Sequence, residues 1–361
     1  MRKWKRILTW LLLSLVTAVI AIACADPSVT IDESRSDNAK NCRVVEHDLG
    51  QAEICGDPQK IVVLSVNALD LLLSLNEQPS GFATRFNVYR GEVFDNPDRQ
   101  IPYLGDRVTT QPANLGQSDA PSLEKMASID PDLILGEAGQ NANNYDLLSQ
   151  IAPTILWKAR TTEGQWQENL RDIAKAIGEE EKAQIAIDRY QNLVAEARSD
   201  FAEVASKHPQ ILLLGTDRIE ENIHAISPNS YLGNLLTDIG FEVIPKPSDN
   251  IQPSLPVSVE TLPKLDDADI IIVLSYNSDF GGGDIEELER SSDKTMTDLI
   301  ENHQLQTIEQ NWKENAIAQS LTASKENRVF FATYAKWNGL NGPIGAELVL
   351  EQLREFLLQS S

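Results

Sequence analysis

The sequence is poor in the side chains from which metal sites and catalytic centres are usually built. Its 361 residues include only three cysteines and four histidines, and the histidines are His47, His208, His224 and His303. None of these has a partner at the spacing of metal ligands. No nucleophile elbow, P-loop, zinc-protease motif or dinucleotide fingerprint occurs either. The sequence therefore predicts no catalytic residue, no cofactor and no metal held directly by the protein.

Positive charge is also scarce. Lysine and arginine number 31 against 54 aspartates and glutamates, which makes the net charge −23 at pH 7. A field of this sign repels nucleic acid and anionic lipid, so neither is expected as a general partner. An anionic ligand would need cations placed locally around it.

The longest hydrophobic run lies at the N-terminus. A basic segment precedes apolar residues 7–23, which end in small side chains before Cys24. This pattern predicts a signal peptide over 1–23, with an uncleaved membrane anchor as the alternative. The stretch resembles a bacterial lipobox, with Ala21 where that pattern prefers leucine, and the resemblance implies a lipid on Cys24. Residues 24–41 are mainly polar and are expected to form a flexible tether.

Cys42 and Cys55 bound a short segment with a turn at residues 48–50. Such a turn would fold the segment into a hairpin that brings the two cysteines opposite each other. Because export leads to an oxidising compartment, we expect a disulfide, with two free thiols as the alternative. A metal site is disfavoured, since no cluster of histidines or further cysteines accompanies the pair.

Strands and helices alternate over residues 60–157 and again after 209, which predicts an α/β fold with two parallel-sheet lobes. Within this alternation, residues 103–105 are predicted as a short strand and 284–290 as the start of a helix. Residues 164–208 contain no strand, and their apolar side chains recur at helical spacing up to and beyond Gly178. They predict one long connecting helix, bent or broken at that glycine. The expected order is an N-terminal lobe with its leading hairpin (42–163), the connecting helix (164–208) and a C-terminal lobe (209–361).

Polar and aromatic side chains follow several of the expected strands. In open α/β sheets ligands bind beyond the carboxyl ends of strands, and two facing lobes would bring such residues to one cleft. Arginine and aromatic side chains together suit a flat, anionic ligand. A solvated surface is the alternative for each arginine, and a place in the core for each aromatic residue. The predicted ligand-binding residues are Asn67, Arg85, Arg107, Arg218, Tyr276, Tyr334 and Trp337.

Four segments carry a family resemblance: residues 123–136 (LEKMASIDPDLILG), 166–194, 230–241 and 328–353. They are similar to ABC-importer substrate-binding proteins of the ferric-siderophore and cobalamin group, especially cyanobacterial, ferric-dicitrate-like lipoproteins. The resemblance implies a helical-backbone periplasmic binding fold that grips a ferric siderophore between its lobes, the iron being held by the siderophore. It also implies a monomer, lipid-anchored on the periplasmic face of a bacterial membrane, that delivers its ligand to an ABC permease and its ATPase.

The same resemblance implies a role for two acidic residues. In relatives, a glutamate at the position of Glu124 meets an arginine of the permease, and Asp238 would be its counterpart on the second lobe. The family pattern often has glutamate where this chain has Thr237. The alternative for Glu124 is an acid that complements the dipole of its helix.

Three alternatives remain open for the whole chain. A corrinoid- or haem-binding protein of the same fold is one, and haem would favour an axial ligand such as Tyr334. The others are an exported α/β enzyme and a surface sensor that lacks a permease of its own.

Overall fold

The computed structural model describes residues 41–86, 88–158, 164–245, 254–277, 288, 290–291 and 293–358. The expected signal peptide, Cys24 and the tether up to residue 40 lie outside the described residues, as do residues 284–287 of the expected helix start at 284–290. None of the helices in the described part combines the length and the apolar composition that a membrane span requires.

The first described element is the expected hairpin. Strands β1 (Cys42–His47) and β2 (Gly50–Cys55) form a two-stranded sheet, and Cys42 and Cys55 are joined by a disulfide. Val45 and Ile54 bury their side chains in the main core. The hairpin is thus part of the folded body, and the predicted disulfide is confirmed.

The first lobe is built on a five-stranded parallel sheet with the order β5-β4-β3-β8-β9. Its strands are β3 (Ile61–Val63), β4 (Pro79–Phe82), β5 (Ala113–Asn114), β8 (Leu133–Glu137) and β9 (Thr154–Trp157). A small ribbon pairs β6 (Gly116–Gln117) with β7 (Ala120–Pro121). The helices are α2 (Val66–Ser74), α3 (Pro97–Gln100), η3 (Gly105–Arg107), α4 (Leu123–Ile129), α5 (Ala138–Asn141), η4 (Ala142–Asn144) and α6 (Tyr145–Ile151).

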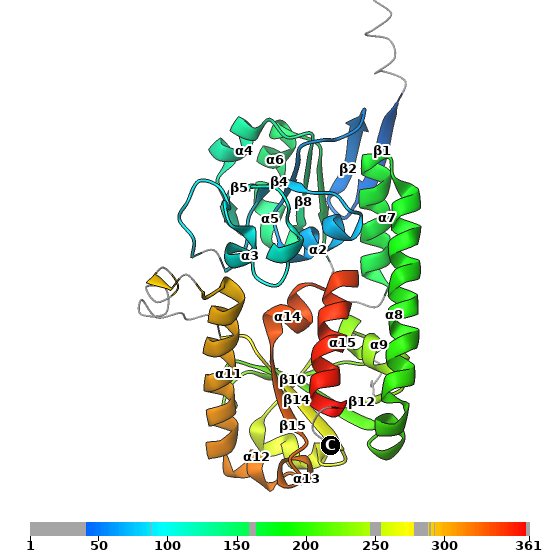
Figure 1. Cartoon of the computed structure of the whole chain (residues 1–361), viewed down its shortest axis with the longest axis vertical. Helices are drawn as coiled ribbons and strands as arrows, with labels where there is room; N and C mark the ends of the chain where they lie inside the picture. Colours follow the sequence, from blue (N-terminus) through cyan, green and yellow to red (C-terminus); the bar gives the residue numbers. More distant parts are fainter. Residues whose placement is uncertain are drawn as a thin grey trace, which may run out of the picture. The chain divides into compact units, whose positions relative to one another are not determined.

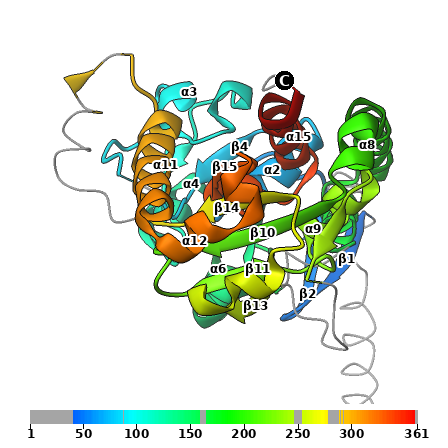
Figure 2. The same cartoon turned by 90° about the horizontal axis from the view of Figure 1, so that it is seen from below.

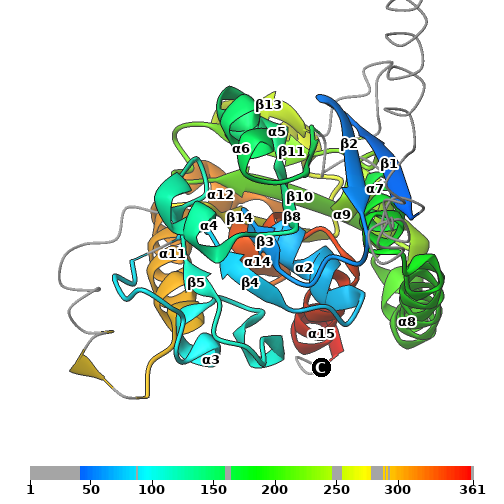
Figure 3. The same cartoon turned by 90° about the horizontal axis from the view of Figure 1, so that it is seen from above.

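Both faces of this sheet are covered, which explains its unbroken apolar strands. In β3, Ile61 and Val63 join the core shared with α2, whereas Val62 joins a separate cluster with α4 and α6. Figure 3 shows α2 on one side of the strands and α4 and α6 on the other. The carboxyl ends of the strands are thereby left free for other contacts.

The connection between the lobes consists of α7 (Gln165–Ile177) and the long α8 (Glu180–Lys207). Gly178 caps α7 with a φ of 76°, in the left-handed region that glycine adopts without strain. The predicted break at Gly178 is confirmed. Figure 1 shows α8 running beside α15, and the two helices pack against each other.

The second lobe contains a six-stranded mixed sheet. The strands β10 (Gln210–Thr216), β12 (Glu242–Ile244), β14 (Ile270–Ser275) and β15 (Val329–Thr333) are parallel, as expected. Two short strands, β11 (Ile223–Ile226) and β13 (Ser254–Val257), add an antiparallel edge that the sequence analysis did not anticipate. The helices are α9 (Tyr231–Asp238), η5 (Val259–Leu265), α11 (Met296–Glu314), α12 (Ala316–Ser320), α13 (Thr322–Lys325), α14 (Tyr334–Gly339) and α15 (Pro343–Leu358).

This sheet is also buried on both faces. Ile211 and Leu213 of β10 belong to the core that includes α9, whereas Leu212 and Leu214 pack in a cluster with α11 and α12. Figure 2 shows α11 and α12 on one side of β10 and α9 on the other. The main core includes apolar residues of both lobes, of α8 and of α15.

One predicted strand is wrong. Residues 103–105 form no strand, because Tyr103 has a φ of 62° and the chain turns into η3. Gly105 lies so close to Pro97 that a Cβ there would be 2.1 Å from the Pro97 carbonyl oxygen. The edge strand of this sheet is instead β5, ten residues further along the chain.

Candidate functional site: a cavity between the two sheets

A cavity of about 470 Å³ lies between the two lobes, at the carboxyl ends of strands from both sheets. From the first lobe, Ser65 follows β3, Arg85 follows β4 and Glu137 ends β8. From the second lobe, Tyr276 follows β14 and Tyr334 follows β15. This is the position at which open parallel sheets present ligand-binding side chains, and the volume is that of a small-molecule site.

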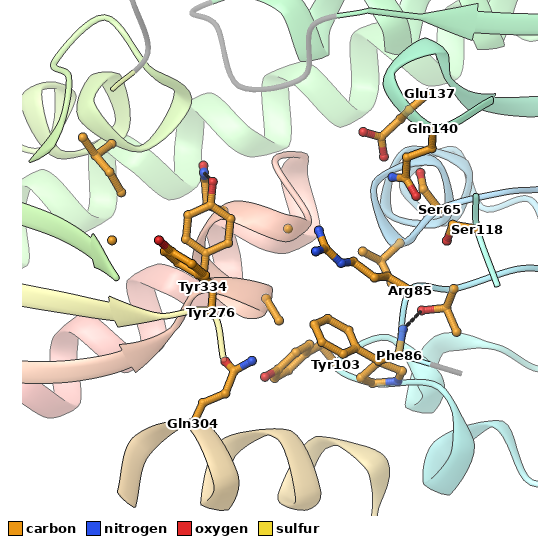
Figure 4. A pocket seen from close by; sticks show the side chains of 18 of the residues that line it. Ser65, Arg85, Phe86, Tyr103, Ser118, Glu137, Gln140, Tyr276, Gln304 and Tyr334 are labelled. Carbon is orange, nitrogen blue, oxygen red and sulfur yellow. Dashed lines mark hydrogen bonds between the residues drawn. The ribbon is translucent and has the colours of Figure 1, made fainter. Parts of the chain in front are cut away.

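Arg85 supplies the positive charge of the cavity. Its backbone follows the buried Thr84, whose hydroxyl oxygen accepts a hydrogen bond from the Phe86 amide at 3.4 Å. Figure 4 shows the guanidinium extending into the cavity. None of the described residues forms a hydrogen bond or ion pair with this side chain. Its donors are therefore available to an acceptor on a ligand.

Two tyrosines from the second lobe face Arg85. The rings of Tyr276 and Tyr334 meet edge to face, with centroids 5.7 Å apart. The Tyr276 hydroxyl donates to the Asn222 carbonyl at 2.9 Å, and the Tyr334 hydroxyl oxygen accepts a hydrogen bond from the Asn338 amide. Burial raises the pKa of Tyr276, and the negative charge of Asp217 adds to the effect. Tyr276 is therefore a neutral phenol at physiological pH.

The wall between these groups contains Phe86, Tyr103 and Gln304. Tyr103 comes from the first lobe, and its hydroxyl shares a 2.9 Å hydrogen bond with that of Thr333 in the second. The sequence analysis missed all three. Phe86 stands next to Arg85 after β4 and could have been found by the same strand-end rule. Tyr103 lies in a turn and Gln304 in the middle of α11, where no sequence pattern marks a ligand contact.

The structure brings together Arg85, Tyr276 and Tyr334 from the predicted set, but not the other two arginines. Arg107 donates to Glu347 of α15 at 3.0 Å and lines a different cavity, because residues 103–107 form a turn and η3 instead of a strand. Arg218 is exposed in the turn after β10, where its carbonyl oxygen accepts a 2.6 Å hydrogen bond from the Thr216 hydroxyl. Among the described residues, neither arginine lines the central cavity.

Asn67 and Trp337 also lie elsewhere. Asn67 is buried inside α2, where it accepts a hydrogen bond from Trp157 Nε1 at 3.2 Å and donates to the Leu340 carbonyl of the second lobe. Trp337 is 0% exposed; its Nε1 donates to Gln352 at 2.8 Å, and its ring stacks on Phe356. Both side chains serve contacts between elements, since Asn67 lies within α2 and Trp337 within α14.

The two acidic residues of the docking hypothesis are exposed, one on each lobe. Glu124 lies in the first turn of α4, whose N-terminus is capped by Ser122: its hydroxyl oxygen accepts from the Lys125 amide at 3.3 Å. Asp238 is the last residue of α9, and its charge adds to the burial that raises the pKa of Tyr190.

Comparison with known proteins agrees with this geometry. The Fe(3+)-citrate-binding protein YfmC of Bacillus subtilis (strain 168) is 26% identical over 345 residues, covering 95% of this chain and 94% of YfmC. The Fe(3+) dicitrate-binding periplasmic protein FecB of Escherichia coli (strain K12) is 24% identical over 298 residues, covering 81% and 82%. The structure of Staphylococcus aureus SirA complexed with staphyloferrin B matches with a TM-score of 0.66 at 23% identity, covering 88% of this chain and 98% of SirA.

A family model supports a stronger statement than these individual relatives. The model described as periplasmic binding protein matches residues 61–334, which span both sheets and the connecting helices. The match extends over more than half of the chain, and its ends coincide with the start of β3 and of α14. This chain therefore belongs to the periplasmic binding protein family.

Proposed function

We propose that the protein captures a ferric siderophore in the cavity between its lobes and delivers it to the permease of an ABC importer. As a periplasmic binding protein the chain is exported and binds its ligand without converting it. The alternative that the chain is an exported α/β enzyme is therefore excluded. The observation that carries the proposal is the position of Arg85, which has no partner in the described part of the chain and lies among aromatic side chains at the carboxyl ends of both sheets.

The relatives supply the ligand class. YfmC and FecB are named for ferric citrate, and other relatives of this chain are named for petrobactin, anguibactin and hydroxamates. Ferric complexes of such chelators present an oxygen-rich surface, to which an arginine with free donors binds through charge-assisted hydrogen bonds.

A binding screen tests the proposal directly. Purified protein is titrated with ferric siderophores of the carboxylate, hydroxamate and catecholate classes, and quenching of tryptophan fluorescence is followed. The iron-free chelators are the matched controls, and haem and cobalamin represent the alternative ligands. We expect at least one ferric siderophore to bind at micromolar concentration or below. Binding of only haem or cobalamin, or of nothing in the panel, would contradict the proposal.

Delivery requires that the protein stay near its permease. We infer that a lipid on Cys24 anchors a monomer to the periplasmic face of the membrane, with residues 25–41 as a tether, and that Glu124 and Asp238 dock on the permease. Several acyl chains on one cysteine anchor stably, whereas one chain does not. Cys24→Ala should abolish acylation and release the mature protein from membranes washed with carbonate, or leave its precursor uncleaved. A variant that remains acylated would refute the lipid anchor.

A further inference from the structure

We propose that the cavity selects a ferric siderophore of low net charge that presents an N–H or O–H donor to Gln304, as a ferric hydroxamate with amide groups does. This inference rests on the proposed function and narrows its ligand class. It is carried by two features of the described lining of the cavity: the scarcity of lysine and arginine, and an amide oxygen that has no hydrogen-bond partner in the described part of the chain.

The first feature is the balance of charge. Among the described residues that line the cavity, Arg85 is the only arginine or lysine; His224 is the other basic side chain, and Glu137 is the one carboxylic acid. Arg107 and Arg218, which could have added positive charge, lie elsewhere. The protein as a whole carries a net charge of −23. A polyanionic complex would thus meet one cation in a repulsive field, whereas a neutral complex avoids that cost.

The charge of a ferric complex depends on the chelating groups. Hydroxamates carry one negative charge each, so that three of them neutralise the ferric ion. Catecholates carry two each, and their tris complexes remain strongly anionic, as do complexes with citrate. The composition of the cavity therefore favours a hydroxamate type over the other two.

The second feature is Gln304 of α11. Its side chain lies in the cavity wall with 0% exposure, and Nε2 donates to the Asn277 carbonyl oxygen at 2.9 Å. A carbonyl oxygen can only accept, so this bond fixes the orientation of the amide. The remaining atom, Oε1, is buried and has no hydrogen-bond partner among the residues that the structure describes. Because a buried acceptor without a partner is costly, a ligand that donates at this point gains affinity.

The two tyrosines extend this arrangement of donors and acceptors. The hydroxyl hydrogen of Tyr276 is used in the bond to Asn222, so its oxygen remains able to accept. The oxygen of Tyr334 accepts from Asn338, so its hydrogen remains able to donate. The cavity thus offers donors at Arg85 and Tyr334 and acceptors at Gln304 and Tyr276. In Figure 4 the two tyrosines lie together on the side opposite Arg85, and Gln304 comes from a third side. A ligand that only accepts satisfies half of these groups, whereas a hydroxamate with amide groups satisfies both kinds.

The charge preference is tested with the unmodified protein. Ferrioxamine E is a neutral ferric trihydroxamate with amide N–H groups, and ferric dicitrate and ferric enterobactin are anionic complexes. We expect ferrioxamine E to bind about tenfold more tightly, or better, than either anion. Equal or tighter binding of an anionic complex would overturn the inference and leave the proposed function intact. If none of the three binds but haem or cobalamin does, the proposed function falls as well.

The role of Gln304 is tested with Gln304→Met, which keeps the length of the side chain and removes both polar atoms. Loss of one neutral hydrogen bond predicts binding of ferrioxamine E that is weaker by about threefold to tenfold. The control is Gln310→Met on the exposed side of the same helix, where the amide donates a hydrogen bond to Glu314 at 2.8 Å. Thermal unfolding shows whether both variants are folded. Unchanged affinity in a folded Gln304→Met protein would refute the donor requirement, and the wild-type comparison stands even if this variant does not fold.

Discussion

At the residue scale, Arg85 combines a full charge with free donors in a cavity that is otherwise aromatic or neutral. In the sequence, Arg85, Arg107 and Arg218 each follow a predicted strand, so that each was an equally good candidate for binding the ligand. The structure distinguishes them by their partners: Arg107 is paired with Glu347, and Arg218 is solvated. Of the three arginines, only Arg85 lines the central cavity, where its guanidinium can bind a ligand.

Replacing Arg85 with alanine should weaken siderophore binding by about tenfold to a hundredfold, since a charge-assisted hydrogen bond contributes about 1.5–3 kcal/mol. The dissociation constant from fluorescence quenching measures this effect. Arg218→Ala, which removes the same charge outside the cavity, is the matched control and should bind as the wild type does. Wild-type affinity in Arg85→Ala would remove Arg85 from the site.

Asp70 is a buried carboxyl group that joins the lobes. It lies in α2 with 0% exposure and accepts hydrogen bonds from the amides of Ile344 and Gly345, at the N-terminus of α15. Desolvation raises the pKa of Asp70 to about 6, although these amides and the Ser74 hydroxyl lower it. The neighbouring Tyr231 hydroxyl donates to the Gly342 carbonyl at 2.8 Å, so it does not compete for the carboxylate. The effect of burial on the pKa of Asp70 is therefore larger than the opposite effect of the hydrogen bonds.

The raised pKa predicts how stability changes with pH. Because the folded state holds the Asp70 proton more tightly than the unfolded chain, the contribution of this group is complete below about pH 4 and is lost as the pH rises through 6. A shift of about two pKa units corresponds to about 3 kcal/mol. Urea unfolding of the wild type and of Asp70→Asn, from about pH 4 to about pH 7, should show their difference in unfolding free energy falling by this amount. If the difference in unfolding free energy between the two proteins did not change with pH, the raised pKa of Asp70 would be contradicted.

At the scale of elements, the break between α7 and α8 decides where the long helix begins. Gly178 adopts a left-handed conformation, and a Cβ there would lie 2.3 Å from Nη1 of Arg43 in the hairpin. The guanidinium is the flexible end of a long side chain and can move aside, but the backbone conformation remains unfavourable for any other residue.

Gly178→Ala should therefore lower the free energy of unfolding by about 1–2 kcal/mol, the cost of the left-handed conformation for a residue with a Cβ. Gly139→Ala in α5 is the control, because a Cβ there meets no atom within 4 Å and needs no unusual backbone angle. Chemical denaturation compares the two. Equal stability of both variants would show that the break does not depend on glycine.

At the scale of the whole molecule, the lobes are joined by buried and polar contacts on two sides of the cavity. Near α8 and α15, Asn67 and Asp70 of the first lobe bind backbone groups of the second. Near α11, Arg99 donates to three carbonyl oxygens, those of Leu288, Ser291 and Lys294. Such contacts fix the position of the two halves of the cavity relative to each other. The start of α4 and the end of α9 remain exposed, and a permease could bind there.

Glu124 is the residue through which we expect this partner to be recognised. Glu124→Ala should leave siderophore affinity unchanged, because the residue lies at the exposed start of α4, and should reduce siderophore uptake by cells. Glu196→Ala, an exposed acid on α8, is the control for the loss of one negative charge. Uptake of labelled ferric siderophore at matched expression measures the effect. Wild-type uptake would return Glu124 to a role in the helix dipole alone.

Much of the fold follows from local patterns in the sequence. The alternation of strands and helices expected over residues 60–157 and after 209, and the helical spacing expected over 164–208, are both present in the structure. Gly178 marked the helix break, and the spacing of Cys42 and Cys55 indicated the disulfide. These features depend on periodicity, backbone preference and short loops, all of which are properties of neighbouring residues.

Only the tertiary structure decided which side chains form the cavity. Arg85, Arg107 and Arg218 look alike in sequence, but the chain turns at Tyr103 into η3 before Arg107, and a hydrogen-bonded turn holds Arg218 outside. Gln304 is oriented by a hydrogen bond to the Asn277 carbonyl, 27 residues away, which leaves Oε1 without a partner among the described residues. Local sequence patterns were enough for two α/β lobes, the helical connection between them and one arginine that lines the cavity. The cavity depends on where distant loops meet, and that meeting is set by packing between elements, which no local pattern records.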